Sequence, residues 1–176
     1  MIARIPRRTS FGSAGVLAVV RQRGKWLGVV APQVGNGRVG WVLWTKVRML
    51  RETWAIDVSL SRRRAVLRHQ GRRYFVFPLA VGTPAYPTPT GLFGVTDRLK
   101  TGGPGSPYGC CVLALSARQP HVAQDWPGGD RIAIHGTNEP WTVGTAASHG
   151  CLRASVGTMR VLMARVPLGT PVRIHA

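Results

Sequence analysis

The chain has 176 residues, 44% of them hydrophobic and 6 of them tryptophan. It can therefore bury a core in one medium domain, or in a small and a medium one, and it is not a disordered tail. Its 24 Lys and Arg against 6 Asp and Glu give a net charge of +18, which favours polyanionic partners such as nucleic acid, anionic lipid or anionic polymer. The basic residues are scattered and no apolar run has the length of a membrane span.

The N-terminal residues 15–49 alternate and turn like a small β-barrel. We predict strands at Val16–Val20, Trp26–Val30 and Val39–Val42, with Asn36-Gly37 as a turn. The pattern W-L-x-V followed by N-G-x-x-G-W-V resembles the bacterial SH3-like modules found on cell-wall enzymes. The alternative is a β-rich extension that packs on the main domain. We divide the chain into an SH3-like module at 1–49 and a second, larger domain at 50–176.

The N-terminus also imitates a twin-arginine export signal, in which Arg7-Arg8 precedes the apolar residues 12–20. That apolar stretch is only about nine residues long, lacks a clear cleavage site and runs into a basic segment. We favour a strand here, and expect any export signal or anchor to lie outside this chain.

Three further strands are predicted at Trp54–Val58, Ala65–Arg68 and Tyr74–Val81. Polar, Arg-rich or Gln-Gly turns separate them, which favours a β-meander. A proline-punctuated loop from Gly82 to Gly91 then leads into Leu92–Val95.

The second half of the chain continues with a Gly- and Pro-rich loop at Thr101–Gly109, which is either a lid or a surface excursion without a role. Cys110–Leu115 is predicted to be a buried strand, and Ile132–Ile134 a strand that ends at His135. The one predicted helix is Val156–Val166, whose apolar residues share one face.

Ser155 can cap that helix, and Val172–Ile174 is a closing strand. The predicted fold is mostly β with one supporting helix.

Three cysteines are present. Cys110 and Cys111 are adjacent, and a disulfide between neighbours closes a strained ring, so we expect no bridges. There is no C-x-x-C pair and the histidines are dispersed, so we expect no metal site and no cofactor. Cys151 remains as a single thiol near two histidines, the minimal equipment for thiol acyl transfer.

Four motifs carry a resemblance to a family: I-H-G-T at 134–137, S-H-G-C-L-R at 148–153, P-T-P-T-G at 87–91 and G-T-P-V at 169–172. Together they resemble the L,D-transpeptidase (YkuD) catalytic domain over roughly residues 50–176. The resemblance implies a β-sandwich with the cysteine near one edge of a sheet. It also implies enzymes that cross-link peptidoglycan stem peptides.

By this resemblance Cys151 is the nucleophile, and His135 takes its proton or forms an ion pair with the thiolate. The Gly136 carbonyl holds the other ring nitrogen of His135, in the place that a carboxylate takes in serine proteases. His149 and the main-chain N–H groups of Gly150 and Cys151 stabilise the tetrahedral oxyanion.

Arg153 faces a substrate carboxylate, and we place Ser148 and Trp141 with it as substrate-binding residues. Taken singly, each of these assignments has a structural alternative: a satisfied strand-end histidine for His135, an ion-pair partner for Arg153, an inert buried thiol for Cys151. The joint spacing favours the catalytic interpretation. Relatives often carry Met and Asn after the arginine, which this chain lacks, so the start of the helix is less certain.

The expected function is L,D-transpeptidation through a cysteine thioester. Water in place of the acceptor amine would make the chain an L,D-carboxypeptidase, and a non-catalytic basic module that binds cell wall or nucleic acid is a further alternative. We expect peptidoglycan stem peptides as substrates, anionic wall polymers as further partners, no nucleic acid, and a monomer. We expect export to the periplasm or cell wall.

Overall fold

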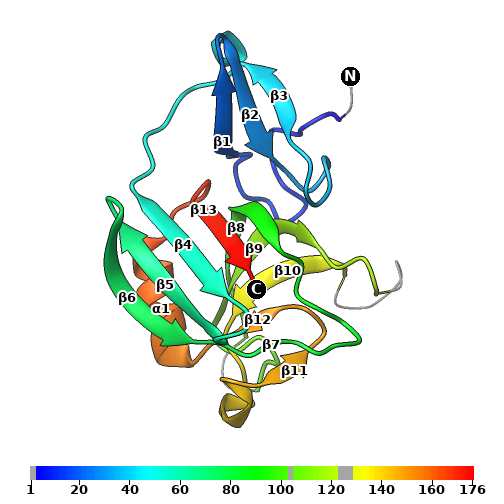
Figure 1. The fold of residues 1–176 in the computed structure, drawn as a ribbon, viewed down its shortest axis with the longest axis vertical. Helices are drawn as coiled ribbons and strands as arrows, with labels where there is room; N and C mark the ends of the chain where they lie inside the picture. The colour runs from blue at the N-terminus through cyan, green and yellow to red at the C-terminus, as the bar shows by residue number, and fades with distance from the viewer. Residues whose placement is uncertain (1–2, 103–104, 123–128) are drawn as a thin grey trace.

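The computed structural model describes residues 3–102, 105–122 and 129–176, and the chain is built mostly of strands with one α-helix (Figure 1). The predicted loop at 101–109 therefore lies partly outside the described residues. The N-terminal strands are β1 (Ala18–Arg23), β2 (Trp26–Val30) and β3 (Gly40–Leu43). The other elements, in chain order, are η1 (Trp44–Lys46), β4 (Trp54–Ser59), β5 (Arg64–His69), β6 (Arg72–Pro78), β7 (Val81–Gly82), β8 (Gly91–Lys100), β9 (Cys111–Arg118), β10 (Arg131–His135), η2 (Pro140–Thr142), β11 (Ala146–Ser148), β12 (Leu152–Arg153), α1 (Val156–Arg165) and β13 (Pro171–His175).

Strands β1, β2 and β3 form an antiparallel three-stranded sheet. The first strand begins two residues later than predicted and includes the polar segment Arg21–Arg23. Backbone pairing with β2 explains the difference, because the hairpin ladder continues to Arg23 opposite Trp26 whatever the side chains are. The resemblance of residues 1–49 to an SH3-like module, and the boundary at residue 50, stay predictions.

Eight strands form the main sheet in the order β12-β10-β9-β8-β13-β4-β5-β6. The long strand β8 joins its two halves, since Gly91–Gly94 pairs with β13 and Val95–Lys100 pairs with β9. The sheet curls, and a single cluster of buried apolar side chains draws on both halves, including Phe77, Leu113 and Leu152. The mostly β fold class is confirmed, with the two layers of the sandwich formed by one sheet that bends at β8.

The predicted meander is confirmed for β4, β5 and β6, which pair as antiparallel neighbours. The predicted strand Tyr74–Val81, however, is broken after Pro78. Proline has no N–H for a further ladder bond, and the chain crosses over so that Ala80 exchanges two main-chain hydrogen bonds with Arg153, 2.8 and 3.0 Å long. This crossing places β7 beside β11, next to the 148–153 motif.

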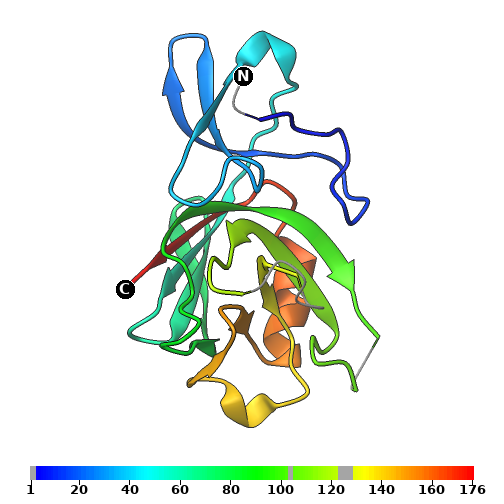
Figure 2. The same ribbon diagram turned by 90° about the vertical axis from the view of Figure 1, so that its right-hand side faces the viewer.

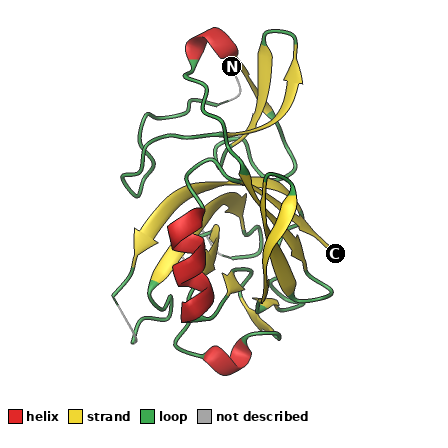
Figure 3. Ribbon diagram, turned by 90° about the vertical axis from the view of Figure 1, so that its left-hand side faces the viewer, coloured by secondary structure: helices red, strands yellow, loops and turns green. Residues whose placement is uncertain are grey.

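The predicted helix is confirmed as α1, which packs against the curled sheet (Figure 3). The Ser155 hydroxyl accepts a hydrogen bond of 3.1 Å from the Thr158 N–H, so it caps the helix as predicted. Met159 and Leu162 are fully buried in the main core. Among the described residues, no helix is long and apolar enough to cross a membrane.

Cys110 and Cys111 are joined by a disulfide, so the prediction that they stay unbridged was wrong. Ring strain disfavours such a bond but does not forbid it. The chain turns at this point, where Gly109 has a φ of +60° and β9 begins at Cys111, so the backbone is not held in a regular strand on both sides of the pair. Cys111 is buried in the main core, as a small apolar residue would be.

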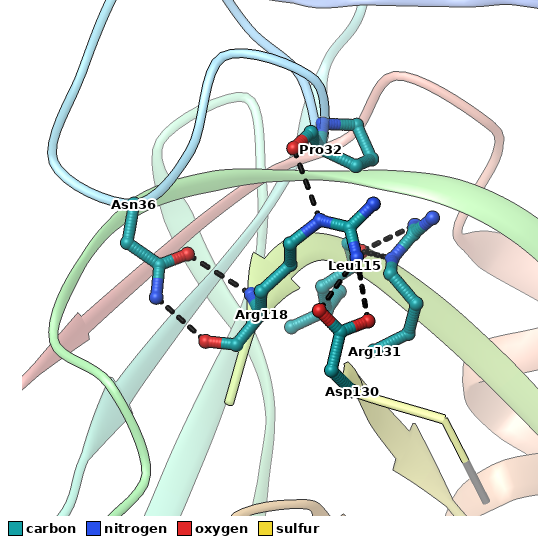
Figure 4. Close-up of polar contacts among 6 residues, drawn as sticks. All are labelled: Pro32, Asn36, Leu115, Arg118, Asp130 and Arg131. Atoms are coloured by element: carbon teal, nitrogen blue, oxygen red, sulfur yellow. Dashed lines mark hydrogen bonds and ion pairs between the residues drawn. The ribbon is translucent and has the colours of Figure 1, made fainter. Parts of the chain in front are cut away.

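The N-terminal sheet is tied to the main sheet through the end of β9 (Figure 4). The Asn36 side chain makes two hydrogen bonds with the main chain of Arg118, donating to its carbonyl at 2.6 Å and accepting from its N–H at 2.9 Å. The Arg118 Nε atom donates to the Pro32 carbonyl at 3.1 Å. In Figure 2 the N-terminal part lies above the arch of β8.

Candidate active site

Strand alternation places the candidate catalytic residues on one face of the half-sheet formed by β9, β10 and β12. Ile132, Ile134 and Leu152 point into the main core. Successive side chains of a strand point to opposite faces. Because β10 and β12 run parallel with His135 opposite Arg153, both residues share the other face, where Cys151 packs against a second small apolar cluster.

A cavity of about 490 Å³ opens on this face. Cys151, His135, His149, Arg153 and Ser148 all line it, so the fold brings these five predicted residues together. The apolar part of the wall includes Leu99 of β8, Val112 and Ala114 of β9, and Ala133 of β10.

His135 is buried and its tautomer follows from its hydrogen bond. Its Nδ1 atom lies 2.5 Å from the Gly136 carbonyl oxygen. A carbonyl can only accept, so Nδ1 carries the hydrogen and donates it, which leaves a lone pair on Nε2 in the neutral ring. Burial lowers the pKa of His135 to about 4; the Gly136 hydrogen bond opposes this shift and the positive charge of Arg153 adds to it. At neutral pH the ring is therefore an uncharged base.

Two neighbours fix the position of this ring. Tyr108 packs edge-on against it, with the ring centroids 5.1 Å apart. Gly109 passes so close to the backbone after His135 that a Cβ atom on it would lie 2.6 Å from the Thr137 nitrogen. Tyr108 also lines the cavity.

Cys151 is partly exposed and is the one free cysteine among the described residues. Burial of its sulfur raises the pKa of the Cys151 thiol, while the main chain of Ala133 and the charge of Arg153 oppose the shift. The sulfur lies 3.8 Å from the Arg131 carbonyl oxygen. With a raised thiol pKa and a lowered imidazole pKa, the resting pair is a thiol and a neutral histidine, and the ion pair is disfavoured.

The turn that presents Cys151 is held from within by Ser148. The buried Ser148 hydroxyl donates to the Cys151 carbonyl at 2.6 Å and accepts from the Gly150 N–H at 3.0 Å. Both bonds hold the turn, so this geometry favours a positioning role over the substrate-binding role predicted for Ser148. The second bond also occupies the Gly150 N–H, so the predicted oxyanion role of this N–H would require the bond to Ser148 to break. The Cys151 N–H is the better candidate among the two main-chain donors.

Two buried polar side chains that the sequence did not single out hold the same turn from outside. Gln119 donates from Nε2 to the carbonyls of Pro87 at 3.1 Å and His149 at 3.0 Å. The Thr88 hydroxyl donates to the Gly150 carbonyl at 2.8 Å. Gly150 itself has a φ of +111°, and a Cβ atom there would lie 2.3 Å from the Gln119 amide, so only glycine fits. In the sequence, Thr88 is marked only by its position in the P-T-P-T-G motif at 87–91.

The remaining predicted residues lie as follows. Arg153 donates from Nη1 to the Glu139 carboxylate at 2.6 Å, so its guanidinium already has an acidic partner. His149 is exposed at the cavity, with its ring 4.8 Å from that of Tyr86. Trp141 is 73% exposed on η2 and does not line the cavity, so the structure does not support its predicted substrate contact. Its short 3₁₀ turn points the indole to solvent.

Among the residues that the structure describes, no group of three or more His, Cys, Asp or Glu side chains is arranged to hold a metal ion. The cavity instead combines a thiol, a neutral imidazole held by a main-chain carbonyl, and an arginine. A curled β-sheet that carries these groups at one edge defines a class of proteins with a cysteine–histidine site suited to acyl transfer.

The family model of the YkuD L,D-transpeptidase catalytic domain matches residues 53–174. The chain belongs to this family. It is 34% identical over 120 residues to the YkuD protein of Bacillus subtilis (strain 168), covering 68% of this chain and 65% of the relative. It is 35% identical over 121 residues to the YkuD protein of Bacillus licheniformis, covering 69% of this chain and 65% of that relative. The chain thus spans about 65% of the length of these relatives.

Solved structures of the same family have a similar fold. The NMR structure of the catalytic domain of an Enterococcus faecium L,D-transpeptidase superposes with a TM-score of 0.50 at 25% identity, covering 72% of this chain and all of that one. An L,D-transpeptidase from Mycobacterium smegmatis gives a TM-score of 0.51 at 16% identity, covering 88% of this chain and 69% of that one. The latter likeness concerns the fold alone.

Proposed function

We propose that the chain is a cysteine-dependent L,D-transpeptidase that joins peptidoglycan stem peptides through a thioester at Cys151. The observation that carries the proposal is the hydrogen bond from His135 Nδ1 to the Gly136 carbonyl, 2.5 Å long. It fixes the tautomer in which Nε2 can accept a proton in the cavity that also holds the Cys151 thiol.

In the acylation step, the Cys151 sulfur attacks the carbonyl carbon at the L-centre of the diamino acid in a donor tetrapeptide. The thiol proton passes to His135 Nε2 as the C–S bond forms, because the raised pKa of Cys151 leaves little thiolate at neutral pH. The negative charge that develops on the carbonyl oxygen is stabilised by the Cys151 N–H, with His149 at the cavity. The tetrahedral intermediate collapses as His135 gives the proton to the departing amine of the terminal D-alanine.

In the second step, a side-chain amine of another stem peptide attacks the thioester. His135 accepts a proton from this amine, an amide bond forms, and the C–S bond breaks to return the proton and the electron pair to Cys151. The thioester conserves the acyl group of the cleaved peptide bond, so two acyl transfers complete the exchange.

Arg153 is the residue that we propose to meet the substrate carboxylate. It shares its guanidinium with Glu139, whose side chain is 44% exposed, so a substrate carboxylate can bind the remaining N–H groups or displace Glu139. The ion pair holds the Arg153 side chain in one position in the absence of substrate.

Product analysis tests this proposal. The protein is incubated with disaccharide tetrapeptides, and the products are separated by chromatography and identified by mass spectrometry. Cross-linked dimers with wild type, and none with Cys151→Ala or His135→Ala, are the expected result. Tripeptides without dimers would instead identify water as the acceptor and make the chain an L,D-carboxypeptidase. Equal product from wild type and Cys151→Ala would refute the role of the thiol.

The setting of the enzyme is also proposed from chemistry. Stem peptides lie outside the cytoplasmic membrane, so we propose export to the periplasm or cell wall, where the chain acts as a monomer. The net charge of +18 supports adhesion to anionic wall polymers, and we propose residues 1–49 as an SH3-like module that packs on the catalytic domain. We expect the protein to co-sediment with cell walls, and the bound fraction to fall steeply as the salt concentration is raised. If the protein stayed bound in high salt, the attachment would not be electrostatic.

A further inference from the structure

A small turn at residues 8–14, here named the N-terminal turn, carries Phe11 at its tip. Arg8 and Ala14 form an antiparallel bridge across its base. Inside it, the Gly12 N–H donates to the Thr9 carbonyl at 3.0 Å, and Gly12 has a φ of +85°, which suits glycine. The backbone that carries Phe11 is therefore held in a closed local structure.

Thr9 fastens the N-terminal turn to the catalytic sheet. Its hydroxyl oxygen accepts hydrogen bonds from the N–H groups of Phe11 at 3.3 Å and Ser13 at 3.1 Å. The same hydroxyl donates to the Asp97 carboxylate, which lies fully buried on β8. A buried carboxylate strongly favours a hydrogen-bond donor, so this contact sets where the turn lies over the sheet.

The position reached by Phe11 is the catalytic cavity. Phe11 lines it together with Cys151 and His135, although it lies outside the residues 53–174 that match the family model. The side chain is 48% exposed, so apolar surface remains open at the cavity. A single exposed aromatic is ordinary on a protein surface. Trp44 is one such residue: it is 50% exposed, belongs to the same N-terminal part and does not line this cavity.

A second tie joins the N-terminal part to another wall of the cavity (Figure 4). Asn36 and Pro32 hold Arg118, as described above. The Arg118 guanidinium in turn donates to both carboxylate oxygens of Asp130, each at 2.6 Å, and Asp130 lines the cavity. The N-terminal part thus contributes to the cavity directly through Phe11 and indirectly through Asp130.

We propose that Phe11 is a substrate-contacting residue, so that the N-terminal part of the chain completes the binding site of the catalytic domain. Its ring packs on the methylene chain of a diamino-acid side chain, the apolar part of a stem peptide. Leu99, Val112 and Ala114 provide the apolar part of the same cavity. The inference rests on the proposed function for the identity of the ligand.

The ring has about half of its surface left to bury, so removing it is expected to weaken peptide binding about tenfold. Because the contact lies on a non-reacting part of the substrate, KM should rise and kcat should stay within about twofold of wild type.

Binding is measured apart from catalysis. Isothermal titration of a tetrapeptide stem into Cys151→Ala, with and without Phe11→Ala, gives the change in Kd. Phe11→Leu keeps apolar bulk and should restore most of the affinity, and Trp44→Ala is the matched control with no expected change. Circular dichroism verifies that each variant is folded.

A tenfold loss of peptide affinity in Phe11→Ala, without a loss in Trp44→Ala, supports the inference. This result does not depend on turnover by the wild type, so a missing transpeptidase activity would count against the proposed function and not against the contact. Equal Kd values for Phe11→Ala and its parent would overturn it. Equal losses in Phe11→Ala and Trp44→Ala would also overturn it, since the effect would then be general. Absence of peptide binding to the parent would overturn both the ligand assignment and the contact.

Discussion

Lowering the pH should destabilise the fold through His135 in particular. This histidine is 4% exposed, and burial lowers its pKa from 6.5 to about 4. Between these values the unfolded chain carries a proton on His135 that the folded chain does not. The free energy of unfolding therefore falls as the pH falls from 6.5 to 4, by about 3 kcal/mol in all, and by about 2 kcal/mol at pH 5. Above pH 6.5 the contribution is constant.

The assay is guanidinium denaturation at pH 7.5 and pH 5 for wild type and His135→Gln. Glutamine keeps hydrogen-bonding groups but does not titrate, and every other titrating group is common to both proteins and cancels in the comparison. The pH-dependent loss of stability should be about 2 kcal/mol larger in wild type. Equal losses in the two proteins would show that His135 titrates normally in the folded state, and would refute the neutral-base argument.

The other predictions concern the site and its supports. The acid limb of kcat/KM should have a pKa near 4 and not near 6.5, read from a pH–rate profile. Gln119→Ala should destabilise the fold by about 1–3 kcal/mol, because the carbonyls that it joins lose their donor, and it should slow acylation in a stopped-flow assay. Asn36→Ala should cost about 1–2 kcal/mol by losing both hydrogen bonds to Arg118, measured by denaturation. Ser155→Ala should cost about 1 kcal/mol through the lost helix cap, seen as a lower Tm. An unchanged value in any of these measurements would contradict the corresponding contact.

Much of the fold follows from local sequence pattern. The strands around Trp26, Ile56 and Ile134 and the helix capped by Ser155 are marked by hydrophobic period and turn residues, and the structure contains them. The spacing of the histidine and cysteine motifs also identified the family correctly. The break after Pro78 was missed because the apolar run continues through it, and only the pairing of Ala80 with Arg153 shows where the chain goes.

The supports of the site could not be read in this way. Gln119 reaches Pro87 and His149, residues 32 and 30 positions away, and Thr9 reaches Asp97 across 88 positions. Such contacts depend on tertiary packing and leave no periodic signal. Trp141 is 73% exposed on η2 and does not line the cavity, so its predicted substrate contact stays a prediction.

The central claim is that Cys151 forms a covalent acyl-enzyme. A carbapenem such as imipenem is a suitable mimic of the acyl donor. Intact-mass spectrometry after incubation with imipenem tests the claim directly. A single adduct on wild type, mapped to Cys151 and missing from Cys151→Ala, is the predicted result. No adduct on wild type, or the same adduct on Cys151→Ala, would contradict it.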